Sequence, residues 1–145
     1  MSSDCLVCRE LAGEVELPGG FLLQDEDAVA FHVPPTEKAP QPYLGHCLVV
    51  TRRHVDHLGD LTEPEATAVA LAARALAGAL RDEGAERVHV AVIGTGSDHF
   101  HQHLFPRYPG VPAGTPWTAL DELPDAPHGG AHKIADFAAR LRLHL

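Results

Sequence analysis

The alternation of apolar and polar positions predicts three short strands in the first third of the chain. Phe21 to Gln24 and Ala28 to Val33 are apolar-rich runs separated by an acidic turn at 25–27, which is typical of a β-hairpin. A further apolar run, Cys47 to Thr51, predicts a buried strand. The proline-rich stretch at 34–42 is short enough to be the loop that precedes it.

The clearest helical pattern begins at Thr62. The spacing Thr62-x-x-Glu65 matches a capping box, in which the side chain of each residue binds the backbone N–H group of the other. Apolar residues then recur on one helical face until Gly84 ends the run: Val69, Ala73, Leu76 and Leu80. A second apolar stripe, between Ile134 and Leu145, predicts a helix at the C-terminus.

Two more strands are predicted between these helices. Val88 to Ile93 is a β-rich run, a glycine-containing loop follows at 94–97, and Asp98 to Arg107 predicts the next strand. Runs of strands with segregated helices favour an α+β fold built on an antiparallel β-sheet flanked by helices. At 145 residues the chain has the usual size of one compact domain, so we expect a single domain over 1–145 with a C-terminal helical tail.

The composition narrows the range of partners. The formal net charge is -9 with histidine neutral, so the average field repels an extended nucleic acid, although backbone N–H groups and a few histidines can hold a single phosphate. The N-terminus lacks the basic and then apolar run of a signal peptide, and no apolar stretch reaches the roughly 20 residues that span a membrane. We therefore expect a cytoplasmic protein with a small-molecule partner and no membrane association.

The cysteines suggest metal or redox chemistry in a reducing compartment. Cys5 and Cys8 form a Cys-x-x-Cys pair, a spacing used both for metal ions and for thiol redox centres. Cys47 lies in a predicted buried strand. The pair is therefore a candidate site, and Cys47 is expected in the core.

The chain has 11 histidines, and three of them alternate along one predicted strand. In a strand, His99, His101 and His103 point to one face at intervals of about 7 Å. Three aligned imidazoles suit either a three-histidine metal centre or a nucleophilic histidine whose neighbours stabilise a reacting phosphate. The preceding loop favours phosphate chemistry, because its glycines permit close approach of backbone N–H groups and its hydroxyls add donors: Gly94, Thr95, Gly96 and Ser97.

The run from His99 to Phe105 resembles the motif of the histidine-triad (HIT) superfamily, in which histidine alternates with an apolar residue. The likeness covers most of the chain and is greatest for the zinc-bearing, bacterial-type HIT hydrolases. Its other parts are the cysteine pair, the glycine-histidine strand Gly45 to Val50, and the basic pair with histidine, Arg52 to His54. The resemblance implies a HIT-like antiparallel sheet flanked by helices, usually as a homodimer, that acts on nucleoside phosphates through a nucleotidyl-histidine intermediate.

The same resemblance assigns a role to each histidine of the motif. His101 matches the nucleophile, and His103 matches the histidine that contacts the phosphate and assists the leaving group. His46 matches a histidine beside the nucleophile. His99 matches the first histidine of the triad, which points to the metal ion in zinc-bearing relatives.

A structural zinc ion is also implied by the resemblance. Its ligands would be Cys5, Cys8, His54 and His99, a Cys2His2 set suited to tetrahedral zinc. For Cys5 and Cys8 alone, a thiol redox pair is the alternative.

Nucleotide recognition rests on the loop and on the end of the second predicted strand. Phe31 and His32 correspond to positions beside the nucleotide. Val33, however, stands where relatives usually have an acidic or amide residue that binds the ribose.

The prediction is therefore a hydrolase of nucleotide phosphoramidates or dinucleoside polyphosphates with His101 as the nucleophile. A nucleotidyltransferase or phosphorylase of the same superfamily is one alternative, although that branch generally has glutamine where this chain has His103. A three-histidine metal-dependent enzyme is another. A catalytically silent nucleotide-binding module is the third, suggested by Val33 and by the loop at 94–97, which differs from that of many relatives.

Overall fold

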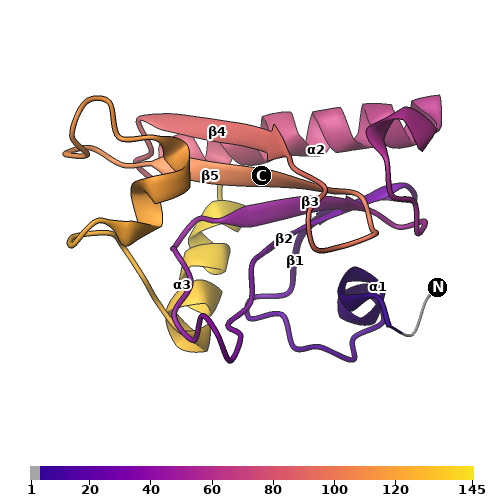
Figure 1. Cartoon of the computed structure of the whole chain (residues 1–145), viewed down its shortest axis with the longest axis horizontal. Coiled ribbons are helices and arrows are strands. Elements are labelled where there is room, and N and C mark those ends of the chain that lie inside the picture. Colours follow the sequence, from indigo (N-terminus) through magenta and orange to yellow (C-terminus); the bar gives the residue numbers. More distant parts are fainter. Residues whose placement is uncertain (1–3) are drawn as a thin grey trace.

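A computed structural model describes residues 4–145 of the chain (Figure 1). In chain order the elements are α1 (Leu6–Leu11), β1 (Phe21–Gln24), β2 (Ala28–His32), β3 (Cys47–Thr51), η1 (Leu58–Asp60), α2 (Glu63–Asp82), β4 (Arg87–Val92), β5 (His101–Arg107), η2 (Trp117–Glu122) and α3 (Ala131–Arg142), where η marks a 3-10 helix. The strands form one sheet in the order β1-β2-β3-β5-β4, and every neighbouring pair is antiparallel. The predicted α+β fold, an antiparallel sheet flanked by helices, is confirmed.

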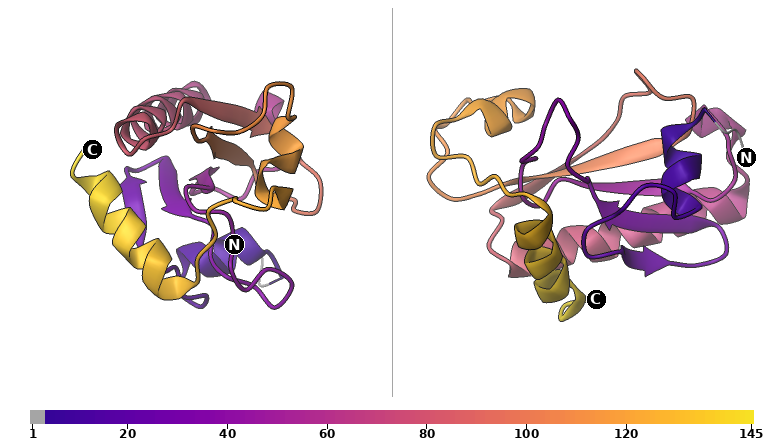
Figure 2. Two further views of the ribbon diagram at one scale, coloured as in Figure 1. Left: turned by 90° about the vertical axis from the view of Figure 1, so that its left-hand side faces the viewer. Right: turned by 90° about the horizontal axis from the view of Figure 1, so that it is seen from below.

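Helix α2 covers one face of the sheet and contacts β2, β3, β4 and β5 (Figures 1 and 2). The main core lies between this helix and the sheet. Its large side chains come from α2, α3, β5 and the residue before β5: Leu76, Leu80, Phe100, Leu104, Phe137 and Leu141. Burial of each such side chain is worth about 1.5–3 kcal/mol. The stripe predicted for the long helix is the face that packs here, and α3 adds its own stripe to the same core.

A smaller apolar cluster lies on the opposite face, beneath α1. Successive residues of a strand point to opposite faces, so Ala30 of β2 joins the core under α2, whereas Val29 and Phe31 join the second cluster. Val7 of α1 and Val50 of β3 complete that cluster. The face opposite α2 is therefore the one that α1 partly covers (Figure 2).

The start of α2 follows the predicted capping signal. Thr62 is the N-cap residue, its hydroxyl accepts the Glu65 N–H group at 3.3 Å, and the Glu65 carboxylate accepts the Thr62 N–H group at 2.9 Å. The helix ends at Asp82, two residues before Gly84, whose φ of 107° lies in the left-handed region. Both predicted helices are confirmed.

Two differences from the sequence-based expectation bear on the site. The short helix α1, which begins directly after Cys5, was not predicted. Strand β5 begins at His101 rather than at Asp98, because its pairing with β3 ends at Val50 and the Phe100 N–H group bonds to the Val55 carbonyl at 2.6 Å instead of to a strand. His99 therefore lies in a bend outside the sheet.

Among residues 4–145, the helices are too short or too polar to cross a membrane. The expected cytoplasmic location stays a prediction.

Candidate functional site

The catalytic candidates lie on the sheet face that is turned away from α2. Strand β5 directs Leu104 into the core under α2, so His101, His103 and Phe105 project from the other face. The rings of His101 and His103 meet edge to face with their centres 5.0 Å apart. Two of the three histidines predicted to share a face, His101 and His103, therefore do so. His99 lies outside the strand.

The backbone holds the His101 ring in one orientation. Its Nδ1 atom lies 2.7 Å from the carbonyl oxygen of His99, and the side chain is 8% exposed. A carbonyl oxygen can only accept a hydrogen bond, so Nδ1 carries the proton. The neutral ring then has its lone pair on Nε2, which is the arrangement that a nucleophilic histidine requires.

His46, at the residue before β3, supports His103. Its Nε2 atom lies 3.0 Å from His103 Nδ1, and the two rings are stacked. Burial, followed by the charges of His103 and His32, lowers the pKa of His46 to about 3, and burial and His101 lower the pKa of His103. Two neutral rings share one proton in this bond. When His46 donates it, His103 keeps a proton on Nε2 and can donate to a phosphate or a leaving group.

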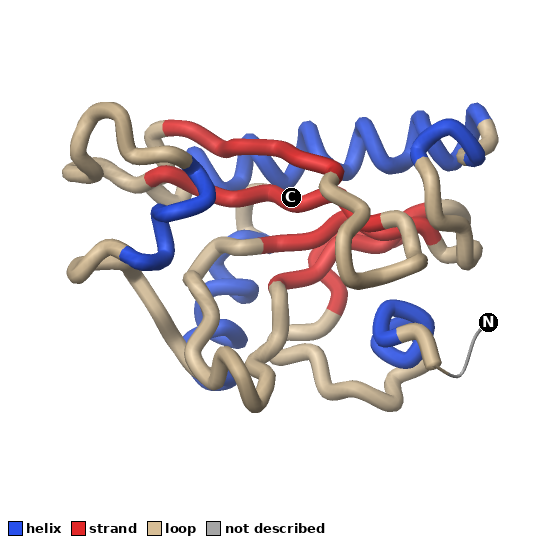
Figure 3. Tube along the Cα trace, in the orientation of Figure 1, coloured by secondary structure: helices blue, strands red, loops and turns tan. Residues whose placement is uncertain are grey.

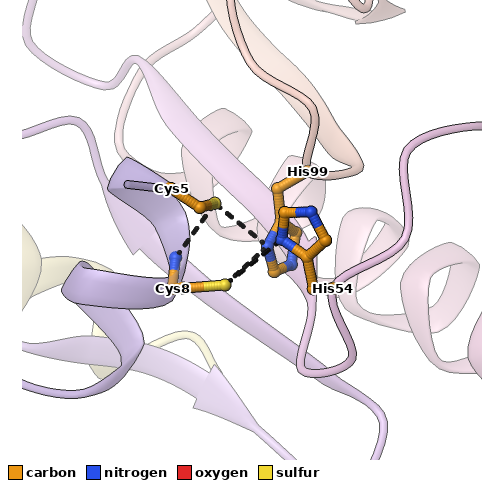
Figure 4. Close-up of side chains that lie close together, drawn as sticks. All are labelled: Cys5, Cys8, His54 and His99. Atoms are coloured by element: carbon orange, nitrogen blue, oxygen red, sulfur yellow. Dashed lines mark hydrogen bonds between the residues drawn. The ribbon is translucent and has the colours of Figure 1, made fainter. Parts of the chain in front are cut away.

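The predicted metal ligands come together at one end of the sheet (Figure 4). His99 Nδ1 lies 3.5 Å from the Sγ atoms of both Cys5 and Cys8, and His54 Nδ1 lies 3.3 Å from Cys8 Sγ. The four ligand atoms all lie within 4.8 Å of one another. Zinc–sulfur and zinc–nitrogen bonds of about 2.3 and 2.0–2.1 Å in a tetrahedron place sulfur and nitrogen about 3.5 Å apart. The cluster therefore has the size and the donor set of a Cys2His2 zinc site.

The protein also prepares His99 to be a ligand. Its Nε2 atom lies 2.7 Å from the Thr51 carbonyl oxygen, which requires a proton on Nε2 and leaves the lone pair of Nδ1 for a metal ion. Burial lowers the pKa of His99 and so favours this neutral form. The triad is thus divided between two sites, because His99 faces the cysteines while His101 and His103 face away from α2. One metal centre made by all three histidines does not fit this geometry.

The glycine loop at 94–97 connects β4 to the bend before β5. Gly94 and Gly96 have φ values of 70° and 87°, and a Cβ atom at either would meet nothing within 4 Å. Gly96 and Ser97 border a hollow of about 210 Å³ together with Cys5 and His54. The Ser97 hydroxyl accepts the His99 N–H group at 3.4 Å. The loop thus lies beside the metal cluster, and phosphate binding by its N–H groups, including that of Thr95, stays a prediction.

Phe31 and His32 lie inside the protein. Phe31 projects from the same face of the sheet as His103, with Leu48 between them in the strand register, but it is fully buried. His32 points to the other face, where its ring meets Phe137 and both of its nitrogens bond to the backbone, at Val33 and at Gly45. Both side chains belong to the core, and a nucleotide contact at these positions stays a prediction.

Aromatic residues beyond the histidines extend the site in a way that the sequence-based prediction missed. Phe105 lies two residues after His103 on the same face, with its ring centre 4.7 Å from that of His46. Trp117 of η2 meets Phe105 edge to face at 6.2 Å. Continuing the two-residue alternation from His103 would have found Phe105, whereas nothing local in the sequence places Trp117 against it.

Comparisons with known proteins give one consistent result. The family model described as "HIT domain" matches residues 14–110. The protein called "Protein hit" of Bacillus subtilis is 27% identical over 114 residues, which cover 74% of this chain and 73% of that protein. Among solved structures, a Hit-like protein from Bartonella henselae has a TM-score of 0.75 at 18% identity and covers 100% of this chain and 98% of its own. A zinc-bound histidine triad family protein from Mycobacterium smegmatis has a TM-score of 0.70 at 19% identity over 97% of this chain and 94% of its own.

Proposed function

Because the chain belongs to the HIT domain family, we propose that it hydrolyses nucleotide phosphoramidates or dinucleoside polyphosphates through a covalent intermediate on His101. One observation carries the proposal: His101 Nδ1 lies 2.7 Å from the His99 carbonyl oxygen. This contact keeps the proton of the ring on Nδ1 and leaves Nε2 free to attack. The pair formed by His46 and His103 supplies a donor beside it.

The reaction has two steps in this proposal. His101 Nε2 attacks the phosphorus that bears the nucleoside, and the bond from phosphorus to the leaving amine or phosphate oxygen breaks. His103 donates a proton to the leaving group and stabilises negative charge on the phosphate. Water then attacks the same phosphorus, which releases the nucleoside monophosphate and restores His101. A transferase would use phosphate or a sugar phosphate in place of water.

The first test replaces the nucleophile. His101→Asn should keep the fold and much of the nucleotide affinity, while turnover of an adenosine phosphoramidate falls by several orders of magnitude, because no neighbouring group can take over the covalent step. Rapid quench of the wild type in alkaline denaturant should trap a nucleotide adduct on the peptide that contains His101, and later treatment with acid should release it.

The outcomes separate the alternatives. Near-normal turnover by His101→Asn would exclude the covalent mechanism. Nucleotide binding by the wild type without turnover of any phosphoramidate or dinucleoside polyphosphate tested would identify a binding module instead. Formation of a nucleoside diphosphate with added inorganic phosphate, or of a nucleoside diphosphate sugar with an added sugar phosphate, in place of nucleoside monophosphate would identify a transferase.

We also propose that the Cys2His2 cluster holds a structural zinc ion. The arrangement of Cys5, Cys8, His54 and His99 supports it, and the zinc-bound relative from Mycobacterium smegmatis has the same fold. Zinc in favourable structural sites has an apparent binding energy on the order of 10 kcal/mol, so its loss should lower thermal stability strongly.

The second prediction follows from this zinc site. Protein purified without chelator should contain about one zinc ion per chain, and Cys8→Ser should lower both the zinc content and the melting temperature. Cys47→Ala is the matched control, because Cys47 is equally buried but lies in the core away from the cluster. A wild-type sample that is free of metal and melts at the same temperature as a zinc-loaded one would contradict the proposal.

A further inference from the structure

The peptide group between His99 and Phe100 connects the metal cluster to the nucleophile. Its carbonyl oxygen accepts the hydrogen bond from His101 Nδ1. Strand β5 begins only at His101, so the hydrogen bonds of the sheet do not determine where this carbonyl points. Its direction depends on whatever holds His99 and Phe100.

Two anchors hold this peptide, one at each end. The His99 side chain is 1% exposed and is held by the Thr51 carbonyl on one side of the ring and by the two cysteines on the other. The Phe100 N–H group donates to the Val55 carbonyl at 2.6 Å.

Both anchors belong to segments without regular structure that carry a residue of the metal cluster. His99 is itself one of the four candidate ligands. Val55 directly follows His54, in the stretch between β3 and η1. His99 lies in the stretch between β4 and β5, which Figure 3 draws as a loop. Both segments meet α1 at Cys8, because its Sγ atom contacts His99 Nδ1 and His54 Nδ1 (Figure 4).

We propose that metal binding by the Cys2His2 cluster positions the nucleophile, with His99 as the positioning residue between them. A bound metal ion fixes the His99 ring and the His54 segment. The peptide that both segments hold is then fixed as well, and its carbonyl keeps the His101 proton on Nδ1. Without the metal ion, the Phe100–Val55 and His99–Thr51 hydrogen bonds remain, but the cysteines hold His54 and His99 only by thiol–imidazole contacts of 3.3–3.5 Å, which are weak. The carbonyl is then held less firmly.

The effect on turnover rests on the proposed function, but the state of the His101 ring is a property of the protein without substrate. The test therefore begins with nuclear magnetic resonance of the full chain carrying ¹⁵N-labelled histidine. In the zinc-loaded wild type, His101 should show a single tautomer with a slowly exchanging proton on Nδ1. In Cys5→Ser, which lowers zinc binding from outside the catalytic strand, the Nδ1 proton should exchange fast and both tautomers should be present.

Cys5→Ser should leave the start of α1 intact. The Cys5 sulfur accepts the Cys8 N–H group at the N-cap of α1, and serine is a favoured residue at that position. Cys47→Ala controls for loss of a cysteine, and Leu141→Ala, on α3, controls for lower stability without change at either segment. Both controls should keep zinc and the Nδ1 tautomer.

Turnover gives the second measurement. With an adenosine phosphoramidate, kcat of Cys5→Ser should fall about 10- to 100-fold, as is typical when a group that orients an active-site residue is lost, while KM changes little. A folded, zinc-free Cys5→Ser protein that keeps the Nδ1 tautomer of His101 would overturn the proposal. If no substrate is turned over, the proposed function fails, and the tautomer still decides this inference.

Partly loaded wild type keeps the test decisive if Cys5→Ser does not fold. Two sets of His101 signals should then appear, and the fraction with the Nδ1 proton should equal the fraction of protein that holds zinc. If zinc removal yields only unfolded chain, or if folded metal-free protein retains the single tautomer, the metal ion does not position the nucleophile and the inference is wrong.

Discussion

At the scale of single residues, the bond between His46 and His103 determines what His103 offers to a substrate. The two rings share one proton over 3.0 Å, so the choice of donor sets whether His103 Nε2 donates or accepts. The resemblance implied a histidine beside the nucleophile, but the hydrogen bond of His46 goes to His103. His46 therefore contacts the motif at His103.

A third prediction follows for this pair. His103→Ala should lower kcat by about 10²–10³, the usual cost of losing one donor to a charged phosphate. His46→Ala should lower kcat less, because His103 remains and loses only the partner that fixes its proton. The double variant should be no slower than His103→Ala, since His46 works through His103. Additive losses in steady-state kinetics would show instead that His46 touches the substrate.

At the scale of elements, His32 and Gly45 join the end of β2 to the turn before β3. His32 Nε2 accepts the Gly45 N–H group at 2.9 Å, and its Nδ1–H donates to the Val33 carbonyl at 2.8 Å. Gly45 has a φ of 94°, and a Cβ there would come within 2.6 Å of Pro106 Cγ and the Tyr108 hydroxyl oxygen. The turn that places His46 therefore needs glycine at 45 and a neutral ring at 32.

This arrangement leads to a fourth prediction, on the dependence of stability on pH. Burial lowers the pKa of His32 to about 4, below its ordinary value of 6.5. Below pH 6.5 the unfolded chain binds a proton that the folded chain does not, so the free energy of unfolding should fall as the pH is lowered from about 6.5 to about 4. The contribution of His32 is about 2–3 kcal/mol across that window.

Urea unfolding of His32→Gln between pH 7 and pH 4 tests this assignment. The variant should lose less stability over that range than the wild type, although it is less stable at pH 7. His132→Gln is the control, because the His132 side chain is 92% exposed and its loss should leave the pH profile unchanged. An unchanged slope in His32→Gln would show that other groups, such as His46, cause the acid sensitivity.

At the scale of the whole molecule, large apolar side chains are exposed in two places, at the β4 edge of the sheet and on α2 near the β1 edge. Strand β4 lies at one edge, and Val90, Val92 and the following Ile93 are 48%, 41% and 50% exposed. Leu71 of α2 is 59% exposed. Such side chains on an open strand edge are commonly covered in an assembly. They support the proposal, implied by the resemblance, that the protein is a homodimer.

The fifth prediction tests the dimer by sedimentation. The wild type at micromolar concentration should have the mass of two chains, and Leu71→Glu or Val90→Lys should reduce it to one, because a charge would have to be buried at the interface. Leu143→Glu changes an equally apolar but 82% exposed residue after α3 and should leave the mass unchanged. A wild-type mass of one chain would refute the proposal.

Local patterns in the sequence were enough to find most of the elements and the chemistry they carry. The capping box at Thr62, the stripes of both helices and the runs that became β1 to β4 depend on residues that are close in sequence, and the structure confirms them. The resemblance supplied the four metal ligands, and the structure brings them together. Such features are predictable because the spacing of apolar residues and the capping of a helix depend only on a short stretch of chain.

Tertiary structure decided how the histidines are divided. The alternation of His99, His101 and His103 predicts one shared face, but β5 starts only where β3 can pair with it, and that limit is set by a strand some 50 residues away in sequence. His99 is left outside the sheet, where Thr51, Cys5 and Cys8 turn its ring toward the metal cluster. His32 likewise faces α3 because its place in the pairing with β3 sets its direction. The alternation of residues in a sequence predicts which side chains of a strand share a face. The strands available for pairing determine where the strand begins and which face of the sheet those side chains occupy.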